Sequence, residues 1–292
     1  MKILSEINKM GYFPFIAIDE FSFYKQMVDK GLVEPSFLQQ IRELTIDSEQ
    51  ASFIFAGVYD LIDMLKDPEY GITSSLANTI ELQIGPIDEK ESAKLIDVSK
   101  KINFTKEANE YIREISNNIP FFIQMICRRC GWYAQATGRD LIGIPEIEKI
   151  IQKMVGENVD EIPGGVIKLD RQFRDTQYRP TNDEKYINAV ISTIALYSKG
   201  RAKSRWIDRD QLIVTWGNHR ATKELKSGAL ANISIYPKIQ EAIETLCRRG
   251  VLKERLIGDT PEYRIGLELF RRWWCQEHPD LESELDKLIL NV

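Results

Sequence analysis

The sequence predicts an α/β fold at the N-terminus, followed by an all-helical region and a C-terminal module of three helices and a β-hairpin. Short apolar runs near the N-terminus end abruptly at polar residues, a helical pattern begins at Asp88, and three helix-sized segments precede a hairpin pattern at 250–265. Strands that alternate with helical stretches predict a parallel sheet. The predicted divisions are an α/β part (1–85), a helical region (86–158), a linker (159–180) and the C-terminal module (181–292).

Three apolar segments, at 12–18, 51–57 and 79–84, are predicted to be strands of that sheet. The first two are short and continuous, and they are rich in aromatic and β-branched residues. This pattern is typical of strands that are buried on both faces. A stretch with helical spacing at 33–43 lies between them, which favours a βαβ arrangement.

Recognisable start signals predict the helices that follow. Asp88 and its acidic neighbours precede an apolar pattern, Thr105 is placed to cap a helix over 106–116, and Pro120 opens a helix that ends near 136. Turn residues at 160–165 indicate a domain boundary. Beyond it, the predicted elements are helices at about 181–196, 208–216 and 235–249, a hairpin at 250–265, and a final helix at 267–278.

Composition limits the class of protein. A net charge of −5 argues against a molecule that binds nucleic acid or a membrane over its whole surface, although it leaves room for a local basic face. No apolar run reaches the roughly 20 residues needed to cross a bilayer. The first residues do not resemble a signal peptide, and four cysteines suit a reducing compartment. We therefore expect a cytoplasmic protein that does not bind membranes.

Two acids, Asp19 and Glu20, directly follow the first predicted strand. The carboxyl ends of parallel strands form the edge where α/β folds bind ligands. One carboxylate there can hold Mg²⁺ through water, and its neighbour can polarise an attacking water molecule. In the alternative interpretation, the acids only form a strand-to-helix junction in which Asp19 caps the next helix.

Residues 16–21 resemble the Walker B motif of STAND and AAA+ ATPases. Further segments are similar to this group in the same order: 53–57 to its sensor strand, 80–87 to its last core strand, 117–124 to the lid segment that touches the nucleotide base, and 246–274 to its winged helix. The resemblance implies a P-loop NTPase core that is incomplete, followed by an all-α lid and a winged-helix domain. It also implies an ATP- or ADP-binding molecular switch that uses Mg²⁺.

The resemblance assigns roles to four residues. Asp19 would be the Mg²⁺-associated and cofactor-binding acid, and Glu20 the catalytic glutamate. Asn118 and Pro120 would contact the nucleotide in the lid. Asparagine stands where the family usually has glycine, a mild change because asparagine tolerates left-handed backbone geometry.

The sequence also departs from the family pattern. It contains no G-x-x-x-x-G-K-[ST] loop, so these 292 residues include nothing that cradles phosphates in the usual way. The strand that carries this loop normally lies beside the last core strand. We therefore expect that a preceding segment or another chain supplies it, and that these 292 residues alone have little or no ATPase activity. The stretch between Arg42 and Arg113 also lacks an arginine finger.

The winged-helix module suggests DNA as a second partner. Its predicted recognition helix, 235–249, places Ile239, Ile243 and Leu246 inward. The candidate phosphate contacts, taken from this helix, the hairpin and a basic stretch near Trp206, are Arg201, Lys203, Arg205, Arg209, Arg248, Arg249, Lys253 and Arg255.

Acidic residues are interspersed among these cations, so a solvated surface or a protein-binding role is the competing interpretation. Two alternatives to the switch thus stay open. One is a DNA-binding regulator with a vestigial core, and the other is a non-enzymatic scaffold that completes the sheet of a protein partner.

Overall fold

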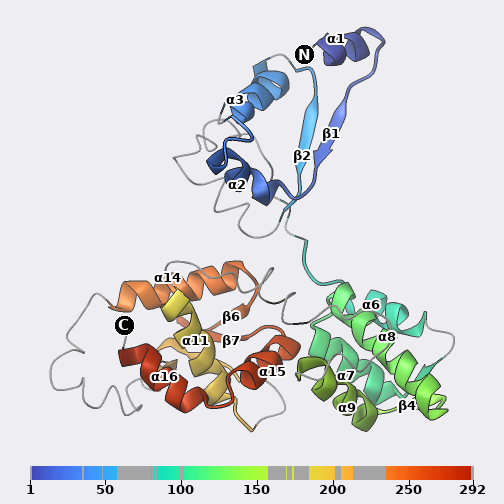
Figure 1. The fold of residues 1–292 in the computed structure, drawn as a ribbon, viewed down its shortest axis with the longest axis vertical. Helices are drawn as coiled ribbons and strands as arrows, with labels where there is room; N and C mark the ends of the chain where they lie inside the picture. Colours follow the sequence, from blue (N-terminus) through green and yellow to red (C-terminus); the bar gives the residue numbers. More distant parts are fainter. Residues whose placement is uncertain are drawn as a thin grey trace. The chain divides into compact units, whose positions relative to one another are not determined.

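A computed structural model describes residues 2–34, 36–47, 49–57, 80, 82, 84–98, 102–156, 169, 173, 184–200, 205–212 and 235–290. These residues form a helix-rich α/β structure whose described strands make three small sheets. The chain divides into two compact units, Met1–Gln83 and Ile84–Val292, shown in Figure 1. No helix in the described part of the chain has the length and apolar character required to cross a membrane.

A parallel pair of strands forms the centre of the first unit. The elements in chain order are α1 (Lys2–Lys9), β1 (Phe15–Ile18), η1 (Phe21–Phe23), α2 (Tyr24–Asp29), α3 (Phe37–Arg42), η2 (Glu43–Asp47) and β2 (Ser52–Phe55). Phe15 lies opposite Ser52 and Ile18 lies opposite Phe55. The first two predicted strands and their parallel pairing are therefore confirmed.

One face of this small sheet packs on the helices beside it. Phe21 and Tyr24 form a buried cluster with two residues of α3, and Phe55 packs against that cluster. On the strands themselves, however, Phe15 is 65% exposed and Ile54 is 47% exposed. The prediction that both faces are buried is therefore wrong for the described residues, because α2 and α3 supply apolar partners to one face.

The third predicted strand, 79–84, is also wrong where the structure describes it. Ile80, Leu82 and Ile84 lie outside any strand and are 83%, 85% and 95% exposed. A strand must pair its backbone N–H and C=O groups with a neighbour. None of the described strands pairs with this segment. The alternating apolar residues therefore do not form a strand in the described part of the chain.

The second unit begins with a helical part, here called the α6–α9 region (residues 88–156). It contains α6 (Glu89–Asp97), β3 (Asn103–Phe104), α7 (Lys106–Ser116), α8 (Pro120–Thr137), β4 (Leu141–Ile142) and α9 (Ile144–Val155). The predicted Thr105 cap is confirmed, since Thr105 accepts from the Ala108 N–H at 3.1 Å. Asp88 also caps its helix, by accepting from the Glu91 N–H at 2.8 Å. These bonds satisfy N–H groups that a helix start leaves unpaired.

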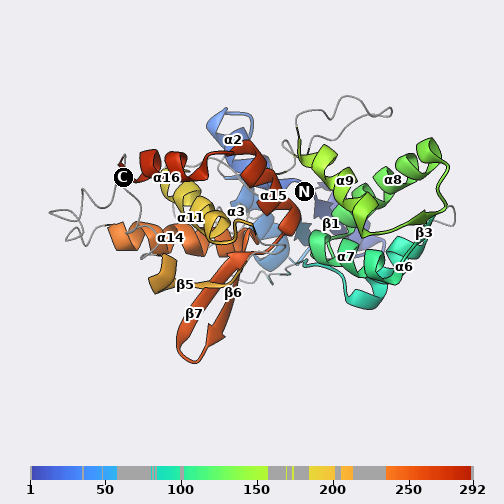
Figure 2. The same cartoon turned by 90° about the horizontal axis from the view of Figure 1, so that it is seen from below.

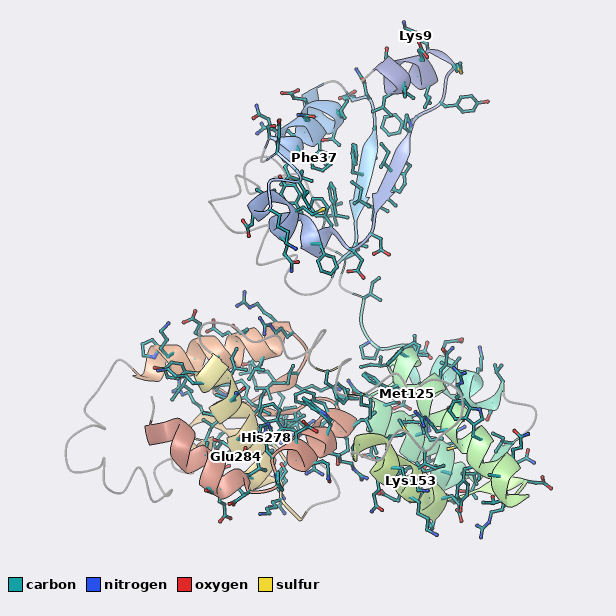
Figure 3. The ribbon with its side chains drawn as sticks, in the orientation of Figure 1. Lys9, Phe37, Met125, Lys153, His278 and Glu284 are labelled. Carbon is teal, nitrogen blue, oxygen red and sulfur yellow. The ribbon has the colours of Figure 1, made fainter. Side chains whose placement is uncertain are left out.

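The remainder of this unit, here called the C-terminal region (residues 184–290), combines helices with an antiparallel sheet. It contains α11 (Glu184–Tyr197), β5 (Ile207–Asp208), α14 (Ile235–Arg248), β6 (Leu252–Ile257), β7 (Thr260–Ile265), α15 (Glu268–Glu277) and α16 (Leu281–Leu290). The strand order is β5-β7-β6, and the β6–β7 hairpin projects from the helices in Figure 2. His278 hydrogen-bonds to Glu284 on α16 (Figure 3).

These elements confirm the helix predicted at about 181–196 where the structure describes it (184–197), the helix near 235–249, the hairpin and the helix that follows it. Of the predicted helix at 208–216, residues 209–212 are helical, and 213–216 lie outside the described residues. The assignment of the module as a winged helix stays a prediction.

An aromatic cluster joins the two parts of the second unit. Phe173 lies 5.6 Å from Phe122 of α8, between ring centroids, and 5.3 Å from both Phe270 and Trp273 of α15. Phe173 and Trp273 are almost fully buried. The α6–α9 region and the C-terminal region therefore share one hydrophobic core.

Candidate functional site

The acidic pair Asp19–Glu20 lies at the carboxyl end of the parallel strands. The Ala56 N–H donates to the Ile18 carbonyl at 2.9 Å, and the Phe21 N–H donates to the Ala56 carbonyl at 2.8 Å. These two bonds hold the ends of β1 and β2 together. Asp19 and Glu20 lie between the residues that make them, Ile18 and Phe21. Asp19 and Glu20 are both exposed, so a ligand can reach either carboxylate.

Glu20 has a strained backbone. Its φ of 54° and ψ of 32° place it in the left-handed region, which glutamate rarely adopts. The Glu20 N–H donates to Asp19 Oδ1 at 2.8 Å, a contact that keeps the two residues close. Asp19 thus retains a second carboxylate oxygen with hard-donor character, which suits Mg²⁺.

The lid residues predicted to contact nucleotide lie at the α7–α8 junction. Asn117 and Asn118 have φ values of 51° and 56°, the left-handed geometry that asparagine tolerates. Asn118 lines a pocket of about 540 Å³ between α7 and the β7–α15 connection. Pro120, the first residue of α8, is not among the residues that line this pocket.

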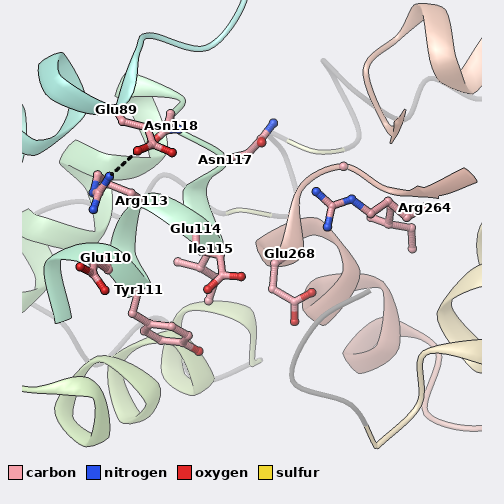
Figure 4. Close-up of a pocket in the computed structure, with 12 residues that line it drawn as sticks. Glu89, Glu110, Tyr111, Arg113, Glu114, Ile115, Asn117, Asn118, Arg264 and Glu268 are labelled. Carbon is pink, nitrogen blue, oxygen red and sulfur yellow. Dashed lines mark ion pairs between the residues drawn. The ribbon is translucent and has the colours of Figure 1, made fainter. Parts of the chain in front are cut away.

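Charged side chains of both signs line the pocket, as Figure 4 shows. Acidic side chains predominate on α7 and α6, where Arg113 forms an ion pair with Glu89 at 3.6 Å. Arg264 extends from β7 on the opposite wall. A volume of this size is within the range of small-molecule sites.

A charged network next to the pocket connects α15 to α7 and α9. Arg272 donates to both carboxylate oxygens of Glu148, at 2.6 and 3.1 Å, and to the Tyr111 hydroxyl at 2.7 Å. Its Nε also donates to Glu268, which Arg271 binds at 2.6 and 2.8 Å. We call this set, Tyr111, Glu148, Glu268, Arg271 and Arg272, the α15 network.

Electrostatics within the α15 network follow from these contacts. The hydrogen bond from Arg272 holds the pKa of Glu148 below its ordinary value. Burial and a hydrogen bond to Glu148 raise the pKa of Tyr111. Burial acts to lower the pKa of Arg272, but its bonds to Glu148 outweigh this effect and raise that pKa. Arg272 and Glu148 therefore form a pair of ions near neutral pH.

Acid is expected to weaken the fold through Glu148. Because its folded-state pKa is lowered, the stabilisation is complete above the unfolded pKa, near 4.5, and is lost as pH falls through the folded value. We expect Glu148→Gln to flatten the decrease in unfolding free energy between about pH 5 and pH 3. Urea titrations across this range test it, and an unchanged pH profile would contradict it.

The residues predicted to contact DNA do not form one exposed face. Arg205, Arg209 and Arg248 are exposed, but Arg249 is buried at 7% exposure, which corrects the outward placement predicted for it. The reason is that Arg249 follows the last turn of α14, whose inner face, with Ile239, Ile243 and Leu246, is confirmed as buried. Lys253 is half-buried.

Arg255, another residue predicted to contact DNA, forms an ion pair with Glu262 at 2.5 Å and lies over the Trp206 ring. Arg201 and Lys203 lie outside the described residues. Among the described residues, no group of three or more His, Cys, Asp or Glu side chains is arranged to hold a metal ion.

The sequence patterns did not single out Tyr111, Glu148 or Arg264 as site residues. Glu148 is one of several acids on a surface helix, and its partner Arg272 is 124 positions away. Arg264 lies directly across from Lys253 in the hairpin, a pairing that only the register of the two strands reveals.

Comparisons with known proteins include a distant structural match to the chain. No family model matches it, and no curated protein sequence matches it. A search of solved structures found the Aeropyrum pernix ORC2 protein, solved as ADPNP–ADP complexes, at 11% identity and a TM-score of 0.39. The match covers all of this chain and 69% of that one. Similarity of this degree does not establish a shared fold.

Proposed function

We propose that this chain is part of an ATP- or ADP-binding molecular switch of the STAND/AAA+ type. The observation that carries the proposal is the exposed Asp19–Glu20 pair at the carboxyl end of two parallel strands. Ligands of open α/β sheets bind at that edge. The left-handed backbone of Glu20 supports the proposal, because strained residues of this kind concentrate at functional sites.

In this proposal each acid has a distinct role. Asp19 holds Mg²⁺ through water, since its exposed oxygens are the hard donors that this ion prefers. Bound Mg²⁺ would neutralise charge on the nucleotide phosphates. Glu20 accepts a hydrogen bond from the attacking water and orients it. Asn118 and Pro120 belong to the lid, and the α6–α9 and C-terminal regions respond to the nucleotide.

The test compares Glu20→Gln with the unchanged protein in the longest reading frame that contains these residues. If that frame includes a phosphate-binding loop, we expect Glu20→Gln to lower ATP turnover at least about tenfold while nucleotide affinity is kept, because only the orientation of water is lost. Asp19→Asn should instead weaken the Mg²⁺ dependence of binding.

A matched control is Glu49→Gln, which removes a glutamate of the same unit that also has a positive φ. It should leave turnover unchanged. Equal turnover in Glu20→Gln and the unchanged protein would refute the catalytic role.

A second candidate function is a scaffold that completes the sheet of a partner. The exposed apolar side chains Phe15 and Ile54, together with Ile80, Leu82 and Ile84, favour it, because parallel sheets are normally covered on both faces. A partner that co-purifies with the chain and is released by Ile54→Lys would support the scaffold. A monomeric chain that binds nucleotide would support the switch.

A further inference from the structure

Two cations on the β6–β7 hairpin lie directly opposite each other. Lys253 and Arg264 are register partners on neighbouring antiparallel strands, and both are half-buried. Like charges at directly opposed positions destabilise a sheet. The pKa of Lys253 is lowered, first by burial of its ammonium and then by the nearby charge of Arg264.

Neither cation has an acidic partner among the described residues. The Lys253 ammonium donates to the side-chain oxygen of Asn117, a neutral acceptor. Arg264 lies 4.8 Å from the centre of the Trp206 ring, and its Nε is buried without a hydrogen-bond acceptor. Burial of part of a cationic side chain is costly unless an anion or a hydrogen-bond acceptor compensates it.

The neighbouring hairpin residue shows how such a cation is usually neutralised. Arg255 also lies over Trp206, at 4.3 Å, but it forms an ion pair with Glu262 at 2.5 Å. Arg264 has the same aromatic support without the carboxylate. Stacking fixes the plane of a guanidinium while its N–H groups stay directed along that plane toward an acceptor.

The space beside Arg264 is large enough for an anion. Arg264 and Asn117 line the 540 Å³ pocket, and Figure 4 shows Arg264 directed from β7 toward Asn117. Lys253 is not among the lining residues, but its ammonium reaches this end of the pocket through its hydrogen bond to Asn117. Two of the four glutamates that line the pocket are already neutralised, Glu89 by Arg113 and Glu268 by the α15 network. Glu110 and Glu114 are exposed on α7, where solvent screens their charge.

We propose that Lys253, Arg264 and the Asn117 amide bind a phosphate group of a small molecule at this end of the pocket. Two adjacent cations match the double charge of a phosphate. The arginine offers a fork of N–H donors, the lysine a mobile point charge, and the asparagine an amide that can donate as well as accept. Because the ligand contacts α7 and β7 together, its binding stabilises the contact between the α6–α9 and C-terminal regions. The site does not depend on the roles proposed for Asp19 and Glu20.

The experiment is a calorimetric titration of the full 292-residue chain with inorganic phosphate at constant ionic strength, repeated with ADP. Saturable binding of phosphate is expected. Lys253→Gln and Arg264→Gln should each raise the dissociation constant about tenfold or more, the change that loss of one charged hydrogen bond produces. Arg255→Gln is the matched control, since it removes a cation from the same hairpin and the same tryptophan but should leave the affinity unchanged.

Several outcomes separate this proposal from its competitors. Equal dissociation constants for phosphate and ADP would identify the free anion as a sufficient ligand. A lower dissociation constant for ADP, raised by Arg264→Gln to the same extent, would identify a nucleotide phosphate as the ligand. Both support the site. Binding of phosphate that all three variants keep would overturn it. Tight, salt-dependent binding of duplex DNA that these variants weaken, with no response to phosphate or ADP, would also overturn it in favour of a nucleic-acid surface. Circular dichroism of each variant verifies that it is folded.

Discussion

Replacing Trp273 by alanine is expected to lower the free energy of unfolding of the second unit by about 3–5 kcal/mol. Trp273 is 2% exposed. Its ring lies 5.3 Å from that of Phe173 and 5.4 Å from that of Phe270. Removal of the indole leaves a cavity beside Phe173 and Phe270, and these rings, which come from two separate chain segments, cannot both move in to fill it.

Urea denaturation followed by far-ultraviolet circular dichroism measures this effect without relying on tryptophan fluorescence. Trp206→Ala is the control, because Trp206 is only partly buried and is in contact with the side chains of Arg255 and Arg264. We expect it to cost about 1 kcal/mol or less. A cost for Trp273→Ala as small as that of the control would mean that the aromatic cluster is not a central part of the core.

Replacing Arg272 by methionine is expected to lower the free energy of unfolding by about 2 kcal/mol. The substitution keeps most of the aliphatic stem but removes the bonds to Glu148 and Tyr111. Removal of one partner from a fully buried ion pair costs more than this. The Arg272 and Glu148 side chains are 19% and 34% exposed, so solvent compensates part of the loss.

A double-mutant cycle with Glu148→Gln isolates the interaction. The sum of the two single losses in unfolding free energy should exceed the loss in the double variant by about 1 kcal/mol, because both substitutions remove the Arg272–Glu148 bonds. Arg139→Met provides a matched comparison. Arg139 forms a similar ion pair with Glu146, but its side chain is 54% exposed, so we expect a loss below about 1 kcal/mol. Additive losses in the Arg272–Glu148 cycle would disprove the coupling.

Local signals in the sequence were sufficient for most helices and for the hairpin. Thr105 and Pro120 mark helix starts through backbone chemistry that acts within four residues, and the structure begins α7 and α8 at the predicted positions. The apolar runs before Asp19 and around Phe53 likewise predicted β1 and β2. The acidic pair of the candidate site was found in the same way, because it follows a strand directly.

Features that depend on distant parts of the chain could not be predicted. The alternation of Ile80, Leu82 and Ile84 indicates a strand, but a strand forms only where a neighbour accepts its hydrogen bonds. Arg249 carries a charge that favoured an exposed position, yet its place at the end of α14 buries it. The pairing of Lys253 with Arg264 required the register of the hairpin, and the pairing of Arg272 with Glu148 required the docking of α15 on α9.

The position of Phe173 has a consequence for how the second unit melts. This residue belongs to the segment predicted to be a linker, but its ring lies between aromatic side chains of α8 and α15. The connection between the two regions therefore contributes to the interior that they share. Heating should disrupt residues 84–292 in a single calorimetric transition, with agreement between the van't Hoff and calorimetric enthalpies. A fragment that ends before Phe173 would lose part of its own interior, so neither region is a self-sufficient folding module.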